Sequence, residues 1–147
     1  MGGDSLFSIM DIATTGLVAE RMRMNVIANN IANINTTKMA DGKPFRRKFV
    51  IFTSDFQKEL QGASKGSGQL GGVRIKEIKT SNAPFEKMYI PGHPDADKEG
   101  FVLASNVKRA SEMMDLMMSS RAYEANLAIM RSAQRMINKS LQAFNRQ

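Results

Sequence analysis

The loop around the single histidine of the chain holds the residues best suited to chemistry. Segment 91–100 contains His93, has an acidic residue at every second position from Asp95 onward, and ends at Gly100. Carboxylates at the first, third and fifth positions with glycine at the sixth match the first half of an EF-hand calcium loop. The twelfth position would be Asn106, which cannot supply the bidentate carboxylate. Two interpretations stay open: a weak cation site, and an Asx-stabilised turn.

Catalysis would need partners for these groups. A histidine base needs a nucleophile or a substrate carbonyl nearby, and a metal site needs two or three further convergent ligands. The chain has no cysteine, and no recognisable partner for His93 stands elsewhere. The serines of the C-terminal segment lack the G-x-S-x-G elbow of hydrolases; they are Ser111, Ser119, Ser120, Ser132 and Ser140. We therefore predict no enzymatic activity and no cofactor.

A glycine pattern near the middle imitates a nucleotide-binding motif. Residues 66–71 read G-S-G-Q-L-G and fit G-x-G-x-x-G. Dinucleotide binding requires that motif to open a helix, because the helix N-terminus holds the pyrophosphate. Here a strand-like alternation follows instead. We interpret residues 61–72 as a flexible glycine-rich loop.

The formal charge of +7 raises the question of a nucleic-acid partner. Residues 1–42 carry three basic and four acidic groups, residues 43–105 eleven and seven, and residues 106–147 seven and three. The only local cluster, Lys43–Lys48, is small enough to be a solvated strand edge. We predict no nucleic-acid binding; the charge also suits an acidic protein partner or a membrane surface.

Neither end of the chain carries a membrane or secretion signal of the usual kind. No uncharged apolar stretch approaches the roughly 18 residues of a membrane span, so we expect no membrane insertion. The first residues lack a basic region, and Asp4 and Asp11 interrupt any apolar core that a signal peptide would need. We therefore expect that the chain is not exported by way of a cleaved signal peptide.

Apolar residues recur at alternating spacings of four and three in two long terminal segments. Only Glu20 is polar at a repeat position of the first segment. Such seams are typical of coiled coils, so we expect two long helices that pair. The N-terminal seam is Leu6, Met10, Ala13, Leu17, Glu20, Met24, Ile27, Ile31 and Ile34. The C-terminal seam is Met113, Leu116, Ser120, Tyr123, Leu127, Met130, Gln134, Ile137, Leu141 and Phe144.

Helix length favours assembly over a compact monomer. At about 1.5 Å per residue the two helices would be roughly 45 and 60 Å long, whereas a compact chain of this size has a radius of gyration near 15 Å. The C-terminal helix also carries a second stripe of small or soft residues that one partner helix cannot cover: Ala110, Met114, Met117, Ala125, Ala128 and Ser132. Several subunits packed around each other would cover it.

The periodicity between the helices changes to that of strands. Segments 45–52 and 73–78 are strand candidates, and segments 85–90 and 100–103 are weaker ones. A β-rich unit this small has a marginal core of its own. The predicted α+β fold has an N-terminal axial helix at 1–38, a β-rich middle unit at 39–105 and a C-terminal axial helix at 106–147.

An asparagine- and threonine-rich cluster, residues 28–37, closes the first helix. Asparagine is a mediocre helix former, so its repeated use near a helix end needs a reason. One interpretation is a cap that satisfies the last helix carbonyls. The other is a hydrogen-bonding surface that fixes the register between neighbouring helices. Both can hold together.

These segments resemble the bacterial flagellar axial family of rod, hook and hook-associated proteins. Residues 28–33 (A-N-N-I-A-N) with 35–37 are similar to the family's N-terminal signature, and 121–126 (R-A-Y-E-A-N), preceded by 113–117, to its C-terminal one. Residues 91–103 with Asn106-Val107 resemble the segment that marks a proximal rod protein. The signature loop residues are His93, Pro94, Asp95, Ala96, Asp97 and Gly100.

The resemblance implies a structural subunit of the periplasm-spanning basal-body rod. Its terminal helices would form the inner tube of a helical assembly, with the β-rich part facing outward. Its partners would be other flagellar rod proteins and copies of itself, with the export apparatus and the MS ring adjacent. It would be exported through the flagellar type III apparatus. The predicted subunit-interface residues are Leu17, Ile27, Asn29, Asn30, Ile31, Asn33, Asn35, Thr36, Thr37, Met117, Arg121, Tyr123, Asn126, Leu127, Met130 and Ile137.

Two other classes of function remain as alternatives. An export-linked adaptor would bind one partner transiently and stay in soluble fractions, whereas a rod subunit copurifies with basal bodies. An enzyme would need a convergent polar pocket around His93, Asp95 and Asp97. For a rod subunit we also expect both chain ends to be disordered before assembly, because ordering a residue costs on the order of 1–2 kcal/mol and the seams lack partners.

Overall fold

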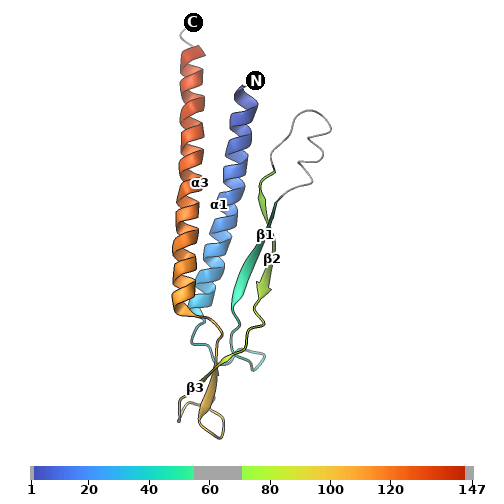
Figure 1. The fold of residues 1–147 in the computed structure, drawn as a ribbon, viewed down its shortest axis with the longest axis vertical. Coiled ribbons are helices and arrows are strands. Elements are labelled where there is room, and N and C mark those ends of the chain that lie inside the picture. The colour runs from blue at the N-terminus through green and yellow to red at the C-terminus, as the bar shows by residue number, and fades with distance from the viewer. Residues whose placement is uncertain (1, 55–70, 145–147) are drawn as a thin grey trace. The chain divides into compact units, whose positions relative to one another are not determined.

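The computed structural model describes residues 2–54 and 71–144, and these contain two long helices with four short strands between them (Figure 1). The elements in chain order are α1 (Gly2–Ala32), β1 (Lys48–Ser54), β2 (Val73–Thr80), β3 (Glu86–Tyr89), β4 (Phe101–Ala104) and α3 (Arg109–Phe144). The expected α+β chain with long terminal helices is confirmed. Most of the predicted glycine-rich loop, residues 61–70, lies outside the described residues.

The strands pair as two separate two-stranded sheets, β1 with β2 and β3 with β4. In the second sheet the strands are antiparallel, with Glu86 opposite Ala104 and Tyr89 opposite Phe101. The strand expected from residue 45 begins only at Lys48. The residues before it are engaged elsewhere, since the backbone N–H of Arg47 donates to the side-chain oxygen of Asn106 at 2.7 Å.

The chain divides into two compact units, and each unit contains part of both helices. Unit 1 comprises Met1–Met22, Phe52–Lys76 and Ser119–Gln147; unit 2 comprises Arg23–Ile51 and Glu77–Met118. The division into helix, β-rich middle and helix that the sequence suggests stays a prediction. Among the described residues, no helix combines the length and the apolar character needed to cross a membrane.

Unit 2 has a core of large apolar side chains. The buried ones are Val26, Ile27, Phe45, Val102 and Val107. The buried polar residues of this unit, as far as the structure describes it, are Asn30, Ser105 and Glu112. These buried residues come from the C-terminal part of α1, the segment before β1, β4 with the residues that follow it, and the first turn of α3.

Unit 1 holds its helices together through small side chains. Its buried residues, as far as the structure describes them, are Ala13, Ala19, Ser119 and Ala133. A Cβ atom placed on Gly16 would come within 2.8 Å of the side-chain amide nitrogen of Asn126, which shows how closely the helices approach there. The Ser119 hydroxyl donates to the Glu20 carboxylate at 2.6 Å. The one polar residue of the predicted N-terminal seam thus has a partner on α3.

The seam of α3 differs from the sequence prediction. Glu112, Ser119 and Ala133 are buried and Asn126 meets α1, so these contacts recur every seventh residue. The predicted seam placed the neighbouring positions, including Met113 and Leu141, in the contact. Met113 is 51% exposed and Leu141 is 59% exposed. The prediction was wrong for these two because it ranked positions by apolarity, whereas close helix approach selects small side chains and paired polar ones. Coiled-coil pairing of the helices stays a prediction.

The end of α1 is capped by the asparagine-rich cluster. The side-chain amide of Asn33 donates to the backbone carbonyl of Asn29 at 2.9 Å, and the backbone N–H of Thr36 donates to the Asn33 carbonyl at 3.1 Å. Helix carbonyls in the last turn have no helical partner and need such donors. The capping interpretation is confirmed, and the helix ends at Ala32, short of the predicted residue 38.

Candidate subunit interface

Both helices keep large apolar side chains in solvent. Val18 on α1 is 60% exposed and Met118 on α3 is 61% exposed. The others on α1 are Phe7, Ile9 and Met22, and the others on α3 are Met113, Met114, Met117, Ile129, Met136 and Leu141. Large exposed apolar surface on a folded chain typically marks an interaction site. The helices therefore present contact surface that the single chain leaves uncovered.

The predicted interface residues fall into three groups. Ile27 and Asn30 are buried within the chain. Asn29, Asn35, Met117 and Arg121 are exposed. The half-buried residues are Leu17, Ile31, Asn33, Thr36, Thr37, Tyr123, Asn126, Leu127, Met130 and Ile137. The second and third groups retain surface for a neighbour, whereas the first group serves the fold of this chain.

Asn30 joins α1 to β1 and α3. Its amide group donates to the backbone carbonyl of Lys48 at 2.7 Å, and its oxygen accepts the Lys48 backbone N–H at 2.9 Å. The same amide group also donates to the Glu112 carboxylate at 2.9 Å. A buried amide is stable only when its donors and acceptor are all paired. The asparagine that the sequence offered as a register-fixing group thus fixes contacts inside the chain.

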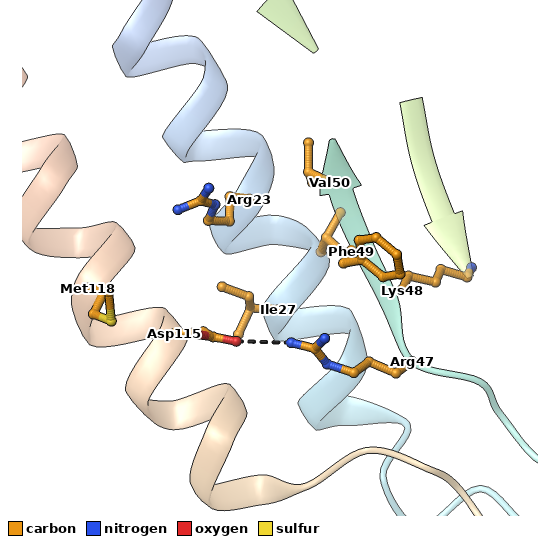
Figure 2. A pocket seen from close by; sticks show the side chains of 9 residues that line it. Arg23, Ile27, Arg47, Lys48, Phe49, Val50, Asp115 and Met118 are labelled. Atoms are coloured by element: carbon orange, nitrogen blue, oxygen red, sulfur yellow. Dashed lines mark hydrogen bonds and ion pairs between the residues drawn. The ribbon is translucent and has the colours of Figure 1, made fainter. Parts of the chain in front are cut away.

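Glu112 is the most unusual buried residue, because its carboxylate is fully shielded from solvent. Arg47 donates to it through Nε. Arg47 also donates to Asp115 through Nη2 at 2.9 Å, the bond drawn in Figure 2. With the Asn30 amide, this arrangement gives Glu112 a charged partner and a neutral donor. Removing one partner of such a pair leaves an uncompensated buried charge, so the network holds its elements in one geometry.

A groove of about 240 Å³ opens beside this network. Figure 2 shows the Arg47 side chain directed at Asp115 on α3, with Ile27 on α1 beside them. The full lining is Arg23, Val26, Ile27, Arg47, Lys48, Phe49, Val50, Asp115 and Met118. The groove thus combines apolar walls with three basic side chains and one acidic one.

A second set of hydrogen bonds joins three segments: the one before β1, the one between β2 and β3, and the one before α3. The side-chain amide of Asn106 donates to the carbonyl of Ala83 at 3.0 Å while its oxygen accepts the N–H of Arg47. Arg46 donates to the carbonyls of Ser81 and Ala83, and its guanidinium lies 4.1 Å from the ring centre of Phe85. The Arg46 side chain thus binds the segment between β2 and β3, whereas the Arg47 side chain binds α3.

The signature loop is built around an Asx turn. The carboxylate of Asp97 accepts the backbone N–H groups of Glu99 and Phe101, at 2.9 and 2.8 Å. Gly100 closes the loop with a φ of 85°, a conformation that favours glycine. The Asx-turn interpretation is confirmed. Among residues 2–54 and 71–144, no three His, Cys, Asp or Glu side chains converge to hold a metal ion.

The same loop contacts the segment after α1. The Thr37 hydroxyl donates to the Asp95 carboxylate at 2.8 Å, and the Lys38 ammonium lies 3.9 Å from it. The structure thereby brings together two predicted groups that lie far apart in the sequence, the threonine end of the asparagine cluster and the signature loop. His93 accepts the backbone N–H of Asp95 at 3.1 Å, a local turn contact.

Comparison with known proteins gives the family of the chain. The description "Flagella basal body rod protein" matches residues 10–38, and "Flagellar basal body rod FlgEFG protein C-terminal" matches residues 98–143. The flagellar basal-body rod protein FlgC of Borreliella burgdorferi is 39% identical, over 92% of this chain and 95% of the relative. Those of Bacillus subtilis and Salmonella typhimurium are 38% and 37% identical, over 92% and 93% of this chain and 96% of each relative. The chain belongs to the FlgC family of basal-body rod proteins.

The two family matches cover the helices and the chain beside them. The first spans most of α1 with the asparagine-rich cluster, and the second spans β4 and nearly all of α3. The expected membership in the flagellar axial family is confirmed. Members of the FlgC family are named as rod proteins, so no catalytic role is implied for this chain.

Sequence reasoning missed Arg47 and Glu112 as partners. Both are charged residues that normally face solvent, and they lie 65 positions apart along the chain. Glu112 lies seven residues before Ser119, on a helix whose contact face carries small or polar side chains. That seven-residue spacing is the pattern that could have identified it. That face becomes visible only once the partner helix is in place.

Proposed function

We propose that this chain is a structural subunit of the rod in the bacterial flagellar basal body. It polymerises with copies of itself and with other rod proteins into a helical drive shaft that transmits torque from the rotor to the hook. The observation that carries this proposal is the similarity to FlgC proteins over more than nine tenths of both chains. The chain acts by packing, and it is not an enzyme.

The exposed helix faces supply the mechanism of assembly. Contacts between different patches on successive subunits do not close on themselves and generate an open helical assembly. Exposed apolar residues such as Val18 and Met117 offer one set of patches, and the groove beside Arg47 offers another. Burying apolar area contributes about 25 cal/mol per Å², so several such side chains give a substantial driving force.

The finer features belong to the same proposal. The rod subunit lies on the rotor-proximal side, next to the MS ring and the export apparatus, and reaches the periplasm through that apparatus without a cleaved signal peptide. Its terminal helices pair as a coiled coil in the assembled state. N-terminal sequencing of the chain recovered from purified basal bodies tests the export part, because cleavage of a leader would remove the first residues.

The main test compares two matched substitutions in cells that lack their own copy. Met117 is 58% exposed on α3, and Met39 is 44% exposed in the segment after α1. Met117→Glu should abolish recovery of the chain in detergent-extracted basal bodies and should abolish motility, because a charge would be buried in the subunit contact. Met39→Glu should leave both intact.

Circular dichroism of the purified variants separates assembly from folding. Both variants should keep the helix content and the unfolding midpoint of the unaltered chain, since both positions are in solvent. If the unaltered chain stays in the soluble fraction and never copurifies with basal bodies, it is an adaptor and not a rod subunit.

A further inference from the structure

An open hollow lies on the solvent side of α3 within unit 1. It has a volume of about 460 Å³ and is lined by Ala128, Arg131, Gln134, Arg135 and Asn138, all of which are exposed. Arg131 and Arg135 thus follow the small side chain of Ala128 by three and seven positions, on the same face of the helix. From Ser119 to Phe144, α3 carries four basic residues and one acidic residue, so this surface is electropositive.

The solvent side of α1 in the same unit has the opposite character. Phe7, Asp11, Thr14 and Val18 follow one another at spacings of four, three and four, which places them on one face of the helix. All four are exposed, and Phe7 and Val18 are 59% and 60% exposed. This face therefore presents one carboxylate between two large apolar side chains.

The contacts inside unit 1 fix how the two faces are aligned along the helices. Gly16 lies against Asn126, and Glu20 lies against Ser119, so α1 and α3 run antiparallel there. Five residues from Gly16 toward the start of α1 correspond to five residues from Asn126 toward the end of α3. Asp11 is therefore level with Arg131, although each faces away from the contact.

We propose that the hollow on α3 receives the Phe7–Val18 face of α1 from a second copy of this chain lying alongside. In that contact Asp11 sits between Arg131 and Arg135, and a neighbour with little axial displacement brings them together. Glu124, the one acidic residue of this stretch of α3, is about 10 Å away from Arg131 along the helix and does not oppose the pairing. This inference rests on the proposed function, since it names the partner of the rod subunit's helices.

Chemical cross-linking tests the contact directly, because the chain has no cysteine of its own. Asp11→Cys and Arg135→Cys variants are produced together in cells that lack the unaltered chain, and purified basal bodies are treated with a short bismaleimide. A flexible linker is preferable to a disulfide, which demands Cα atoms within about 7 Å. The expected result is a product of twice the chain mass that neither variant gives alone.

A matched control uses Ser140→Cys in place of Arg135→Cys. Ser140 is exposed on α3 but lies about 140° around the helix from Arg135. Its pairing with Asp11→Cys should give at most about a tenth of the cross-linked product. Equal yields from the two pairs would overturn the proposal, and so would a product whose mass shows that the Asp11→Cys variant is joined to a different rod protein.

Charge exchange gives an independent readout. Asp11→Arg should lower incorporation into basal bodies several-fold, and adding Arg131→Asp with Arg135→Asp should restore it. Absence of rescue, with the three-site variant folded by circular dichroism, would overturn the proposal. Absence of the unaltered chain from basal bodies would instead contradict the proposed rod function, so the two failures are distinguishable.

Discussion

The two units hold the same pair of helices by different means. In unit 2, directional hydrogen bonds from Asn30 and Arg47 to a buried Glu112 join α1, β1 and α3 around large apolar side chains. In unit 1, the buried side chains that the structure describes are alanines and a serine, and Phe7, Val18 and Met136 are among the large apolar side chains that stay exposed. Both units leave large apolar side chains in solvent, Met117 in unit 2 and Val18 in unit 1 among them, but among the described residues only unit 2 also buries large apolar side chains.

Among the described residues, burial of large apolar side chains is thus concentrated in unit 2, whereas both units offer exposed apolar surface for assembly. Burial of valine, isoleucine and phenylalanine contributes roughly 1.5–3 kcal/mol per side chain, far more than burial of alanine. Unit 2 is therefore expected to be the stable part of the isolated chain. Unit 1 gains a comparable stabilisation only when another subunit covers Phe7, Val18 or Met136.

The largest expected effect comes from breaking the unit 2 network. Arg47→Ala leaves the Glu112 carboxylate buried without its charged partner and should lower the free energy of unfolding by about 3 kcal/mol. Urea unfolding of the purified chain measures it. Lys38→Ala is the control, because Lys38 is exposed and lies 3.9 Å from Asp95, and it should change stability by less than about 0.5 kcal/mol. Equal effects would show that the network does not set the stability of unit 2.

A neighbouring pair of asparagines gives a sharper comparison. Asn30→Ala removes the bonds to Lys48 and Glu112 and should cost about 2 kcal/mol. Asn29→Ala should be nearly neutral, since the Asn29 side chain is exposed and only its backbone carbonyl is used. Thermal unfolding of both variants measures the difference, and equal changes at the two positions would mean that the buried amide bonds of Asn30 do not stabilise the chain.

Hydrogen exchange tests the contrast between the units without any substitution. In the isolated chain, the backbone amides of α1 from Phe7 to Met22 should exchange at least about tenfold faster than those from Val26 to Ala32, because few large side chains are buried around them. In assembled basal bodies the difference should disappear. Uniform protection along α1 in the isolated chain would contradict the predicted disorder of its ends.

The smallest effects concern two glycines. Gly16→Ala displaces only the end of the Asn126 side chain and gains about 1 kcal/mol of helix propensity, so its net change should be near zero. Gly42→Ala meets open space but must adopt a φ of 76°, which should cost about 1 kcal/mol. Chemical denaturation of the pair measures both, and the reverse order would show that the helix contact in unit 1 is the tighter constraint.

Local patterns predicted the elements well. Apolar residues spaced alternately four and three apart indicated both helices, and the apolar–polar alternation from Val73 indicated β2. Both signals depend only on the residues within one element. The cap at Asn33 and the turn at Asp97 follow equally local rules. Family resemblance added the likeness to rod proteins, which the comparisons confirm.

The face that α3 turns to α1 was predicted less well. Apolarity favoured Met113 and Leu141, whereas the contact falls on Glu112, Ser119 and Asn126. A prediction of contact positions from the sequence of one helix assumes that its apolar residues face the partner helix. Here several large apolar side chains of α3 are exposed on the single chain, so apolarity alone does not identify the face that meets α1.

The Asn30 amide has a consequence for the sheets as well as for the helices. The backbone carbonyl of Arg47 accepts the N–H of Ser81, the residue after β2, so the adjacent N–H and carbonyl of Lys48 point to the opposite side of the strand, where Asn30 binds both. An incoming strand from another molecule would need those two groups. A side chain thus covers the start of this strand edge, which disfavours strand-to-strand aggregation.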